Sequence, residues 1–226
     1  MWNLLNRYKM RSEITSKLER FTEHLKRGDI VIFPTDTIYA VGCKISAASS
    51  IEKLYQLRKR PSSQPMLILA SNLKQAKAYG RINLAQEKLL KTFWPGPLTA
   101  VLKAKDGVPT IIQGKEATVA IRVPNFPKLA KLIGIVGEPL VAPSANFHGR
   151  ATPAHFNQID KRLISLVDYT LDLNDFDQKT KMLGVASTII DMTSDSYKIL
   201  RQGAVSKVEL ENKIAQVQVV RRGLVD

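Results

Sequence analysis

Short apolar runs that alternate with helix-forming segments constrain the fold of this chain more than any other feature of its sequence. The run over 29–34 is rich in β-branched residues and closes at Pro34, and the run over 66–70 is apolar throughout. Runs of this length and composition are typical of buried strands that feed into turns. Further strands are predicted over 98–104, 118–123, 139–142, 169–173, 186–192 and 198–203.

Helical periodicity occupies the segments between these strands. Apolar residues recur at helical spacing from Ile14 to Leu25. We expect this helix to begin at Ser12, as its cap, and to end at Gly28. Further helices are predicted from 51 to the RKRP stretch at 58–61, over 72–79 and over 84–93, and a capped helix followed by a strand or an extended segment is predicted from 206 onward. Because strands alternate with helices first and cluster later, the sequence predicts an α/β fold with a mixed sheet.

The composition favours one globular domain that attracts anions. A chain of 226 residues can bury a core without disulfides, and its 34 Lys and Arg against 20 Asp and Glu give a net charge of +14, which favours polyanionic partners. Cys43 is the sole cysteine and the three histidines lack ligand spacing, so no metal site is predicted. The apolar runs are too short to cross a bilayer and no signal-peptide core is present, so we expect a cytoplasmic protein without membrane contact.

Polar side chains follow the predicted strands. The stretch FPTDT places two threonines and an aspartate directly after the first strand, and PSAN places Ser144 and Asn146 after a later one. Ligands commonly bind at the carboxyl ends of strands in α/β sheets. The same residue types also form turns that satisfy only their own backbone, so the motifs alone leave both interpretations open.

Two further motifs contain basic residues that could bind an anion. The stretch RKRP puts Arg58, Lys59 and Arg60 before a proline, which suits either phosphate binding or a solvated helix end. Arg122 lies in an otherwise apolar strand, where its burial is costly without an anion, so the pattern favours a carboxylate or phosphate partner. Neither a P-loop nor a GxGxxG motif is present, which disfavours the corresponding nucleotide-binding folds.

A series of motifs follows along the chain: PTDTIYAVG, LRKRPSSQPM, FWPGPLTAVL, TVAIRVP, PLVAPSAN, STIID and ILRQGAVS. In this order and at these spacings they resemble the YrdC/TsaC family, the threonylcarbamoyl-AMP synthases. The resemblance implies a twisted, open, mixed α/β sheet around a large basic cavity. It also implies a nucleotidyltransferase that forms L-threonylcarbamoyladenylate and pyrophosphate from L-threonine, bicarbonate and ATP. The chain would divide into an N-terminal extension (1–14), a catalytic domain (15–206) and a short tail (207–226).

The resemblance further implies which residues bind the substrates. L-Threonine would contact Thr35, Leu67, Arg122, Ala142 and Ser187. ATP would contact Arg58, Ser62, Thr118, Ser144, Asn146, Thr152 and Arg201, while catalysis would depend on the cations Arg58, Lys59 and Arg60. Mg²⁺ would arrive bound to ATP. Arg58 stands where the family usually has lysine, so we expect nucleotide affinity or geometry to differ there, and Leu67 stands where it often has histidine, so we expect threonine binding to differ.

The implied product serves partner proteins that make N6-threonylcarbamoyladenosine in tRNA. An alternative of another class is a non-catalytic module of the same fold that binds tRNA or other RNA through its positive charge. A related carbamoyl-adenylate chemistry, found in hydrogenase-maturation carbamoyltransferases, is disfavoured because those chains carry cysteine-rich domains and this chain has a single cysteine.

Overall fold

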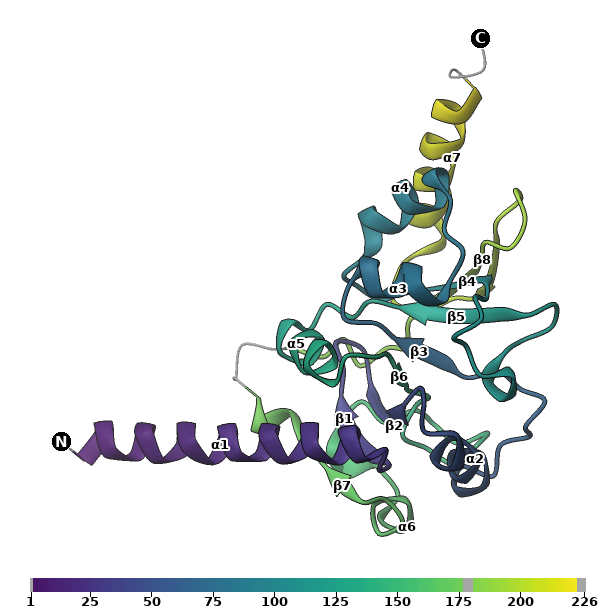
Figure 1. Cartoon of the computed structure of the whole chain (residues 1–226). Helices are drawn as coiled ribbons and strands as arrows, with labels where there is room; N and C mark the ends of the chain where they lie inside the picture. The colour runs from purple at the N-terminus through teal and green to yellow at the C-terminus, as the bar shows by residue number, and fades with distance from the viewer. Residues whose placement is uncertain (1, 177–180, 223–226) are drawn as a thin grey trace.

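The computed structural model describes residues 2–176 and 181–222, and a mixed β-sheet runs through the middle of this part of the chain (Figure 1). Its nine strands lie in the order β7-β1-β2-β6-β3-β5-β4-β8-β9. The strands are β1 (Val31–Pro34), β2 (Tyr39–Lys44), β3 (Leu67–Leu69), β4 (Leu98–Lys103), β5 (Thr118–Arg122), β6 (Leu140–Val141), β7 (Tyr169–Thr170), β8 (Thr188–Asp191) and β9 (Lys198–Arg201). The neighbouring pairs β1·β7, β3·β5 and β4·β8 are parallel and the other pairs are antiparallel, and β7 and β9 form the two edges. The predicted open, mixed α/β sheet is thus confirmed.

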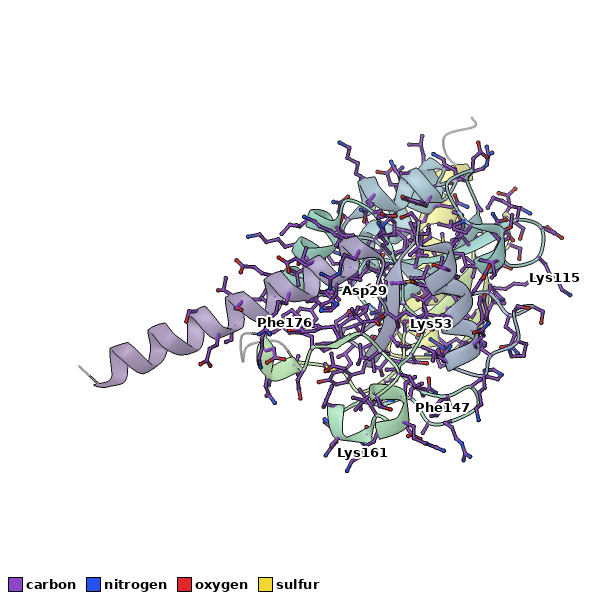
Figure 2. All side chains as sticks on the ribbon, turned by 60° about the horizontal axis from the view of Figure 1, so that its bottom comes forward. Asp29, Lys53, Lys115, Phe147, Lys161 and Phe176 are labelled. Atoms are coloured by element: carbon purple, nitrogen blue, oxygen red, sulfur yellow. The ribbon has the colours of Figure 1, made fainter. Side chains whose placement is uncertain are left out.

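Helices cover both faces of the sheet, and each face has its own apolar core. On one face, the rings of Phe21 and Phe33 meet edge to face at 5.6 Å between centroids, and those of Phe126 and Phe176 lie 4.7 Å apart. Phe176 lies beside the first helix in Figure 2. That face carries α1 (Trp2–Arg27) and α5 (Pro127–Val136). The other face carries α2 (Ala48–Leu57), α3 (Leu73–Tyr79), α4 (Leu84–Phe93) and α7 (Lys207–Arg222).

The first helix is longer than predicted. It begins at Trp2, so Ser12 lies inside it and the prediction of a cap there was wrong. Trp2–Arg27 contains neither glycine nor proline, and a serine inside a helix costs well under about 1 kcal/mol, too little to end it. Gly28 does end the helix, as predicted, with φ at +90°. Figure 1 shows α1 running out past the edge of the sheet.

Several elements differ from the sequence-based prediction. Strand β2 and helix α5 were not predicted. Ser206 caps the last helix by accepting a hydrogen bond from the backbone N–H of Glu209 at 3.2 Å. This helix then continues through Arg222, so the strand or extended segment expected there is wrong for residues up to 222, and 223–226 lie outside the described residues. Short helical turns complete the chain: α6 (Lys161–Ile164), η1 (Thr110–Ile112), η2 (Phe156–Gln158) and η3 (Leu173–Asp175).

The sheet brings distant segments of the chain to one place. The β1–β2 hairpin leaves residues 35–38 as its turn, because Pro34 pairs with Tyr39. Strands β3 and β5 run parallel, with Leu69 opposite Arg122, and β6 runs antiparallel beside β3. Hydrogen bonds from Arg122 to Asp36 and Thr37 hold the turn of the first hairpin against the end of β5. In the part of the chain that the structure describes, no helix is long and apolar enough to cross a bilayer.

Candidate active site

A cleft opens where these strand ends meet, with about 400 Å³ of empty space that includes its open mouth. Its walls come from the first hairpin, from β3, from the end of β5, from the segment after β6 and from the strands at the β9 edge. The lining residues are Thr35, Thr37, Ile38, Tyr39, Ala40, Leu67, Leu69, Arg122, Ala142, Ser144, Thr152, Ala186, Ser187 and Arg201. All the residues implied for L-threonine therefore line one cleft, together with Ser144, Thr152 and Arg201 from the set implied for ATP.

The hairpin turn at 35–38 is held by its own threonines. The Oγ1 of Thr35 accepts hydrogen bonds from the backbone N–H groups of Thr37 at 3.1 Å and Ile38 at 3.2 Å, and donates to the carbonyl of Ile38 at 2.7 Å. The Oγ1 atoms of Thr35 and Thr37 are 2.9 Å apart. Because the hydroxyl of Thr35 donates its hydrogen to the carbonyl of Ile38, the hydroxyl of Thr37 donates the hydrogen bond between the two threonines. The turn satisfies its own backbone, as one interpretation of the motif predicted, and it also lines the cleft, so ligand binding by the motif stays a prediction.

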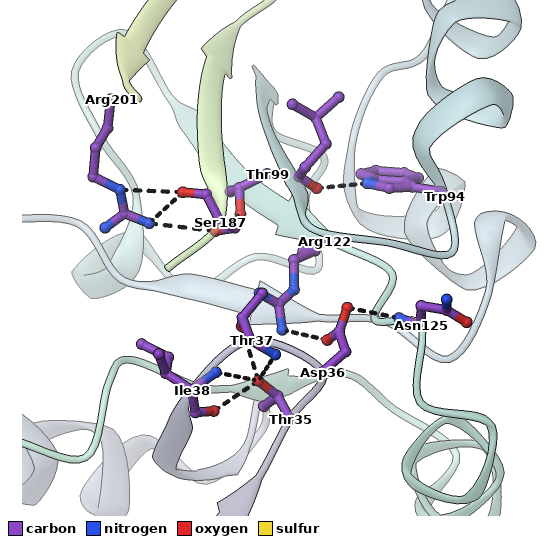
Figure 3. Close-up of polar contacts among 11 residues, drawn as sticks. Thr35, Asp36, Thr37, Ile38, Trp94, Thr99, Arg122, Asn125, Ser187 and Arg201 are labelled. Atoms are coloured by element: carbon purple, nitrogen blue, oxygen red, sulfur yellow. Dashed lines mark hydrogen bonds and ion pairs between the residues drawn. The ribbon is translucent and has the colours of Figure 1, made fainter. Parts of the chain in front are cut away.

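Arg122 forms a buried ion pair across the end of β5 (Figure 3). Its Nη2 donates to Oδ1 of Asp36 at 2.9 Å and its Nη1 donates to Oγ1 of Thr37 at 2.6 Å. The residue is 3% exposed, and burial lowers the pKa of Arg122, an effect that the charge of Asp36 opposes. The carboxylate that the sequence predicted for this arginine thus comes from within the chain. Its Nε remains buried without a partner among the described residues.

Arg58 is buried without a carboxylate partner in the described residues. Its Nε donates to the carbonyl of Asn146 at 3.0 Å, and its Nη2 donates to Oδ1 of Asn146 at 3.0 Å and to Oγ of Ser144 at 3.3 Å. Burial, with a smaller contribution from the charge of Arg60, lowers the pKa of Arg58 to about 10. Its Nη1 is buried and unpartnered. A buried cation with a free donor favours an anionic ligand.

Arg201 and Ser187 form the opposite wall of the cleft. Arg201 donates to the carbonyl of Ser187 from Nε at 3.2 Å and from Nη2 at 2.7 Å. The Oγ of Ser187 lies 2.8 Å from Oγ1 of Thr99, which is fully buried. Burial and the charge of Arg122 both lower the pKa of Arg201. Among the described residues, only Arg122 of these three arginines has a carboxylate partner, so the cleft is electropositive.

The other predicted residues lie away from the walls of this cleft. The Nζ of Lys59 sits 5.9 Å from the ring centroid of Phe147, and Arg60 donates to the backbone carbonyls of Gln64 at 3.4 Å and Pro65 at 2.9 Å. Ser62 is exposed in the loop before β3, and Thr118 stands at the start of β5, at the other end of the strand from Arg122. The roles predicted for Lys59, Arg60, Ser62 and Thr118 stay predictions.

Sequence reasoning missed some polar residues of the cleft and its surroundings. Thr37 lines the cleft, yet only its neighbour Thr35 was singled out as a ligand contact. Asp36 was noted only as a turn carboxylate, and Thr99 was not noted at all. Thr99 is a polar residue inside the apolar stretch LTAVL, and the structure shows that it is fully buried. A threonine in a predicted buried strand is a signal that could have identified it, since buried polar groups need a partner.

Comparisons with known proteins agree with this architecture. The Sua5/YciO/YrdC family model, described as telomere recombination, matches residues 23–203. Proteins named threonylcarbamoyl-AMP synthase are similar to the chain: that of Pyrococcus abyssi is 31% identical over 196 residues (86% of this chain, 56% of the relative) and that of Bacillus subtilis 32% over 209 residues (89% and 57%).

A solved structure, that of P. abyssi Sua5 complexed with L-threonine, is 30% identical and superposes with a TM-score of 0.80, covering 87% of this chain and 57% of that one. The chain thus spans just over half the length of these relatives.

Proposed function

Since this chain belongs to the Sua5/YciO/YrdC family, we propose that it is a threonylcarbamoyl-AMP synthase that uses L-threonine, bicarbonate and ATP. The observation that carries the proposal is the gathering of every residue implied for L-threonine in one electropositive cleft. Two buried guanidiniums at or beside the cleft also keep unpartnered donors, as a site for anionic substrates requires.

L-Threonine would bind at the hairpin end of the cleft. Arg122 would receive the substrate carboxylate, because its guanidinium still has donors to offer after pairing with Asp36. The hydroxyls of Thr35 and Ser187 would contact the polar groups of the amino acid. Leu67 and Ala142 provide an apolar wall against which the methyl group of the substrate would pack.

ATP would bind towards the Arg58 side of the cleft. Arg58, Ser144 and Asn146 form one hydrogen-bonded group, and Thr152 and Arg201 line the cleft beside it. We propose that this group holds the phosphates, with Lys59, Arg60, Ser62 and Thr118 contributing from outside the walls. Asp36 pairs with Arg122 and does not line the cleft, so Mg²⁺ would enter with the triphosphate and keep much of its water.

The chemistry would depend mainly on positioning. After threonine releases its ammonium proton to solvent, its amine attacks the carbon of bicarbonate, and a carbon–oxygen bond breaks to release water and leave a carbamate. A carbamate oxygen then attacks the α-phosphorus, and the bond to the bridging oxygen breaks to release pyrophosphate. Among the described residues, those that line the cleft include no histidine, aspartate or glutamate, so orientation and cationic stabilisation would supply the acceleration.

One assay tests the proposal. The purified protein is incubated with ATP, Mg²⁺, bicarbonate and L-threonine, and pyrophosphate is measured beside reactions with L-serine and without bicarbonate. We expect release that requires both threonine and bicarbonate. A folded sample that binds ATP but releases no pyrophosphate would contradict the proposal and favour the RNA-binding module. We further propose that the product passes, in the cytoplasm, to partner proteins that modify tRNA.

A further inference from the structure

Asp36 lies beside the cleft with both carboxylate oxygens engaged by the protein (Figure 3). Oδ1 accepts from Nη2 of Arg122 at 2.9 Å, and Oδ2 accepts from the backbone N–H of Asn125 at 3.0 Å. The residue is 4% exposed and is not among those that line the cleft. Because Asp36 is buried behind the walls of the cleft, it does not meet a ligand in the cleft directly.

Arg122 connects this carboxylate to the cleft. One end of its guanidinium is fixed by Asp36, and the other end is fixed by Oγ1 of Thr37 at 2.6 Å. A guanidinium is planar and rigid, so holding both terminal nitrogens fixes the plane of the whole group. Each terminal nitrogen uses one of its two hydrogens in these bonds, and the Nε hydrogen has no partner among the described residues.

The charges indicate what Asp36 does for a ligand. The Arg122–Asp36 pair is neutral as a unit, so it adds little to the attraction of an anion from solution. Arg58 and Arg201 supply that attraction, since neither has a carboxylate partner in the described part of the chain. The contribution of Asp36 is then geometric: it holds Arg122 in its binding orientation before the ligand arrives, which reduces the cost of ordering it later.

We propose that Asp36 is a positioning residue, which sets the plane of the Arg122 guanidinium so that its remaining N–H groups meet the carboxylate of the amino-acid substrate. The inference rests on the proposed function. It assigns Asp36 no proton transfer, because the residue is 4% exposed and does not line the cleft. It also gives Thr37 the same role from the other side of the guanidinium, with a neutral hydroxyl instead of a charge.

The test measures initial rates of pyrophosphate release for Asp36→Asn as functions of threonine and ATP concentration. Asparagine has the shape of aspartate, but its NH₂ group cannot accept a hydrogen bond, so either Arg122 or the backbone N–H of Asn125 loses its acceptor. We expect KM for threonine to rise at least about tenfold. The expected kcat stays within about threefold, KM for ATP is unchanged, and the pH profile keeps its shape. Asp168→Asn is the matched control, because Asp168 accepts a backbone N–H from Ile30 at 2.8 Å at the opposite end of β1.

A second variant covers the case in which Asp36→Asn fails to fold, as loss of one partner from a buried pair can cause. Thr37→Val keeps the shape of the side chain and removes only the hydroxyl that Arg122 uses. We expect KM for threonine to rise several-fold in a variant whose melting temperature is close to that of the parent protein. Unfolding is followed by circular dichroism for every variant.

Each result decides the inference. A folded Asp36→Asn variant with unchanged KM for threonine overturns it, and so does an unchanged KM in Thr37→Val when Asp36→Asn does not fold. Loss of kcat together with one limb of the pH profile would make Asp36 a general base and overturn it as well. An inactive parent protein defeats the proposed function instead, which keeps the two failures distinguishable.

Discussion

At the scale of single residues, Arg58 has the most consequential environment in the cleft region. It is 3% exposed, its pKa is lowered to about 10 by burial, and its bonds are to neutral groups of Ser144 and Asn146. A guanidinium bonded only to neutral acceptors keeps its full positive charge for a ligand. The guanidinium of Arg58 bonds to Ser144 and Asn146 through two nitrogens, whereas the single ammonium of a lysine could not make the same set of contacts.

Replacement of Arg58 is therefore expected to affect the nucleotide more than the amino acid. Arg58→Met removes the charge and leaves the Oδ1 of Asn146 short of a donor, so KM for ATP should rise about ten- to a hundredfold while KM for threonine changes little. Arg58→Lys should show a smaller rise, because it restores the charge without the fork. Lys53→Met, which removes an exposed cation from the same helix, is the control. Equal effects on both Michaelis constants would argue against a phosphate contact.

At the scale of elements, most strands and helices with strong local patterns were predicted, and β2 and α5 were missed for different reasons. The run over 29–34 contains β1, because β-branched residues favour a strand whatever their partners. Strand β2 carries YAVGCK, a weak strand pattern, and owes its conformation to pairing with β1 and β6. Helix α5 had a usable signal that was overlooked: Leu129, Leu132 and Ile133 at helical spacing, proline at its start and Gly137 after its end.

The candidate site shows the same division between local and distant information. The sequence motifs identified residues that line the cleft, since each motif places polar groups at a strand exit. Sequence alone gave no means of pairing Asp36 with Arg122, because their contact joins residues 86 positions apart. The resemblance supplied the list of residues, and the three-dimensional structure supplied their arrangement.

Gly203 follows β9 and lies close to the backbone of Ala186 and Ser187, two residues that line the cleft. A Cβ added there would lie 2.3 Å from the carbonyl oxygen of Ala186 and 2.5 Å from the carbonyl carbon of Ser187, so the segment carrying Ser187 would have to move. Gly203→Ala should lower the free energy of unfolding by about 1–3 kcal/mol and raise KM for threonine, as measured by denaturant unfolding and initial rates.

Gly134→Ala is the matched control, because a Cβ at Gly134, inside α5, would meet nothing within 4 Å. This substitution should stabilise the protein by about 0.5–1 kcal/mol and leave both Michaelis constants unchanged. A Gly203→Ala variant as stable and as active as the parent protein would contradict this prediction, because it would show that the backbone beside Ser187 can shift without loss of stability or activity.

At the scale of the whole molecule, two kinds of positive charge have to be separated. The net charge of +14 is spread over the chain, largely on exposed lysines and arginines, whereas Arg58 and Arg122 are buried. Exposed charges are screened by salt within about 8–10 Å at physiological ionic strength, and buried ones are screened much less. Any general affinity for RNA would arise from the first kind, and the proposed catalysis from the second.

Salt should therefore separate RNA binding from catalysis. We expect the affinity for tRNA, measured by fluorescence anisotropy, to fall at least about a hundredfold between 50 and 200 mM salt, as counterion release requires for several phosphate contacts. Over the same range kcat for pyrophosphate release should change by less than about threefold, because buried guanidiniums are weakly screened. Arg58→Met should lose ATP binding and keep the salt dependence of tRNA binding. If that variant instead lost tRNA affinity in proportion to its loss of ATP affinity, the cleft itself would be the RNA site, and the cations buried beside it would serve recognition of the polymer and not adenylate chemistry.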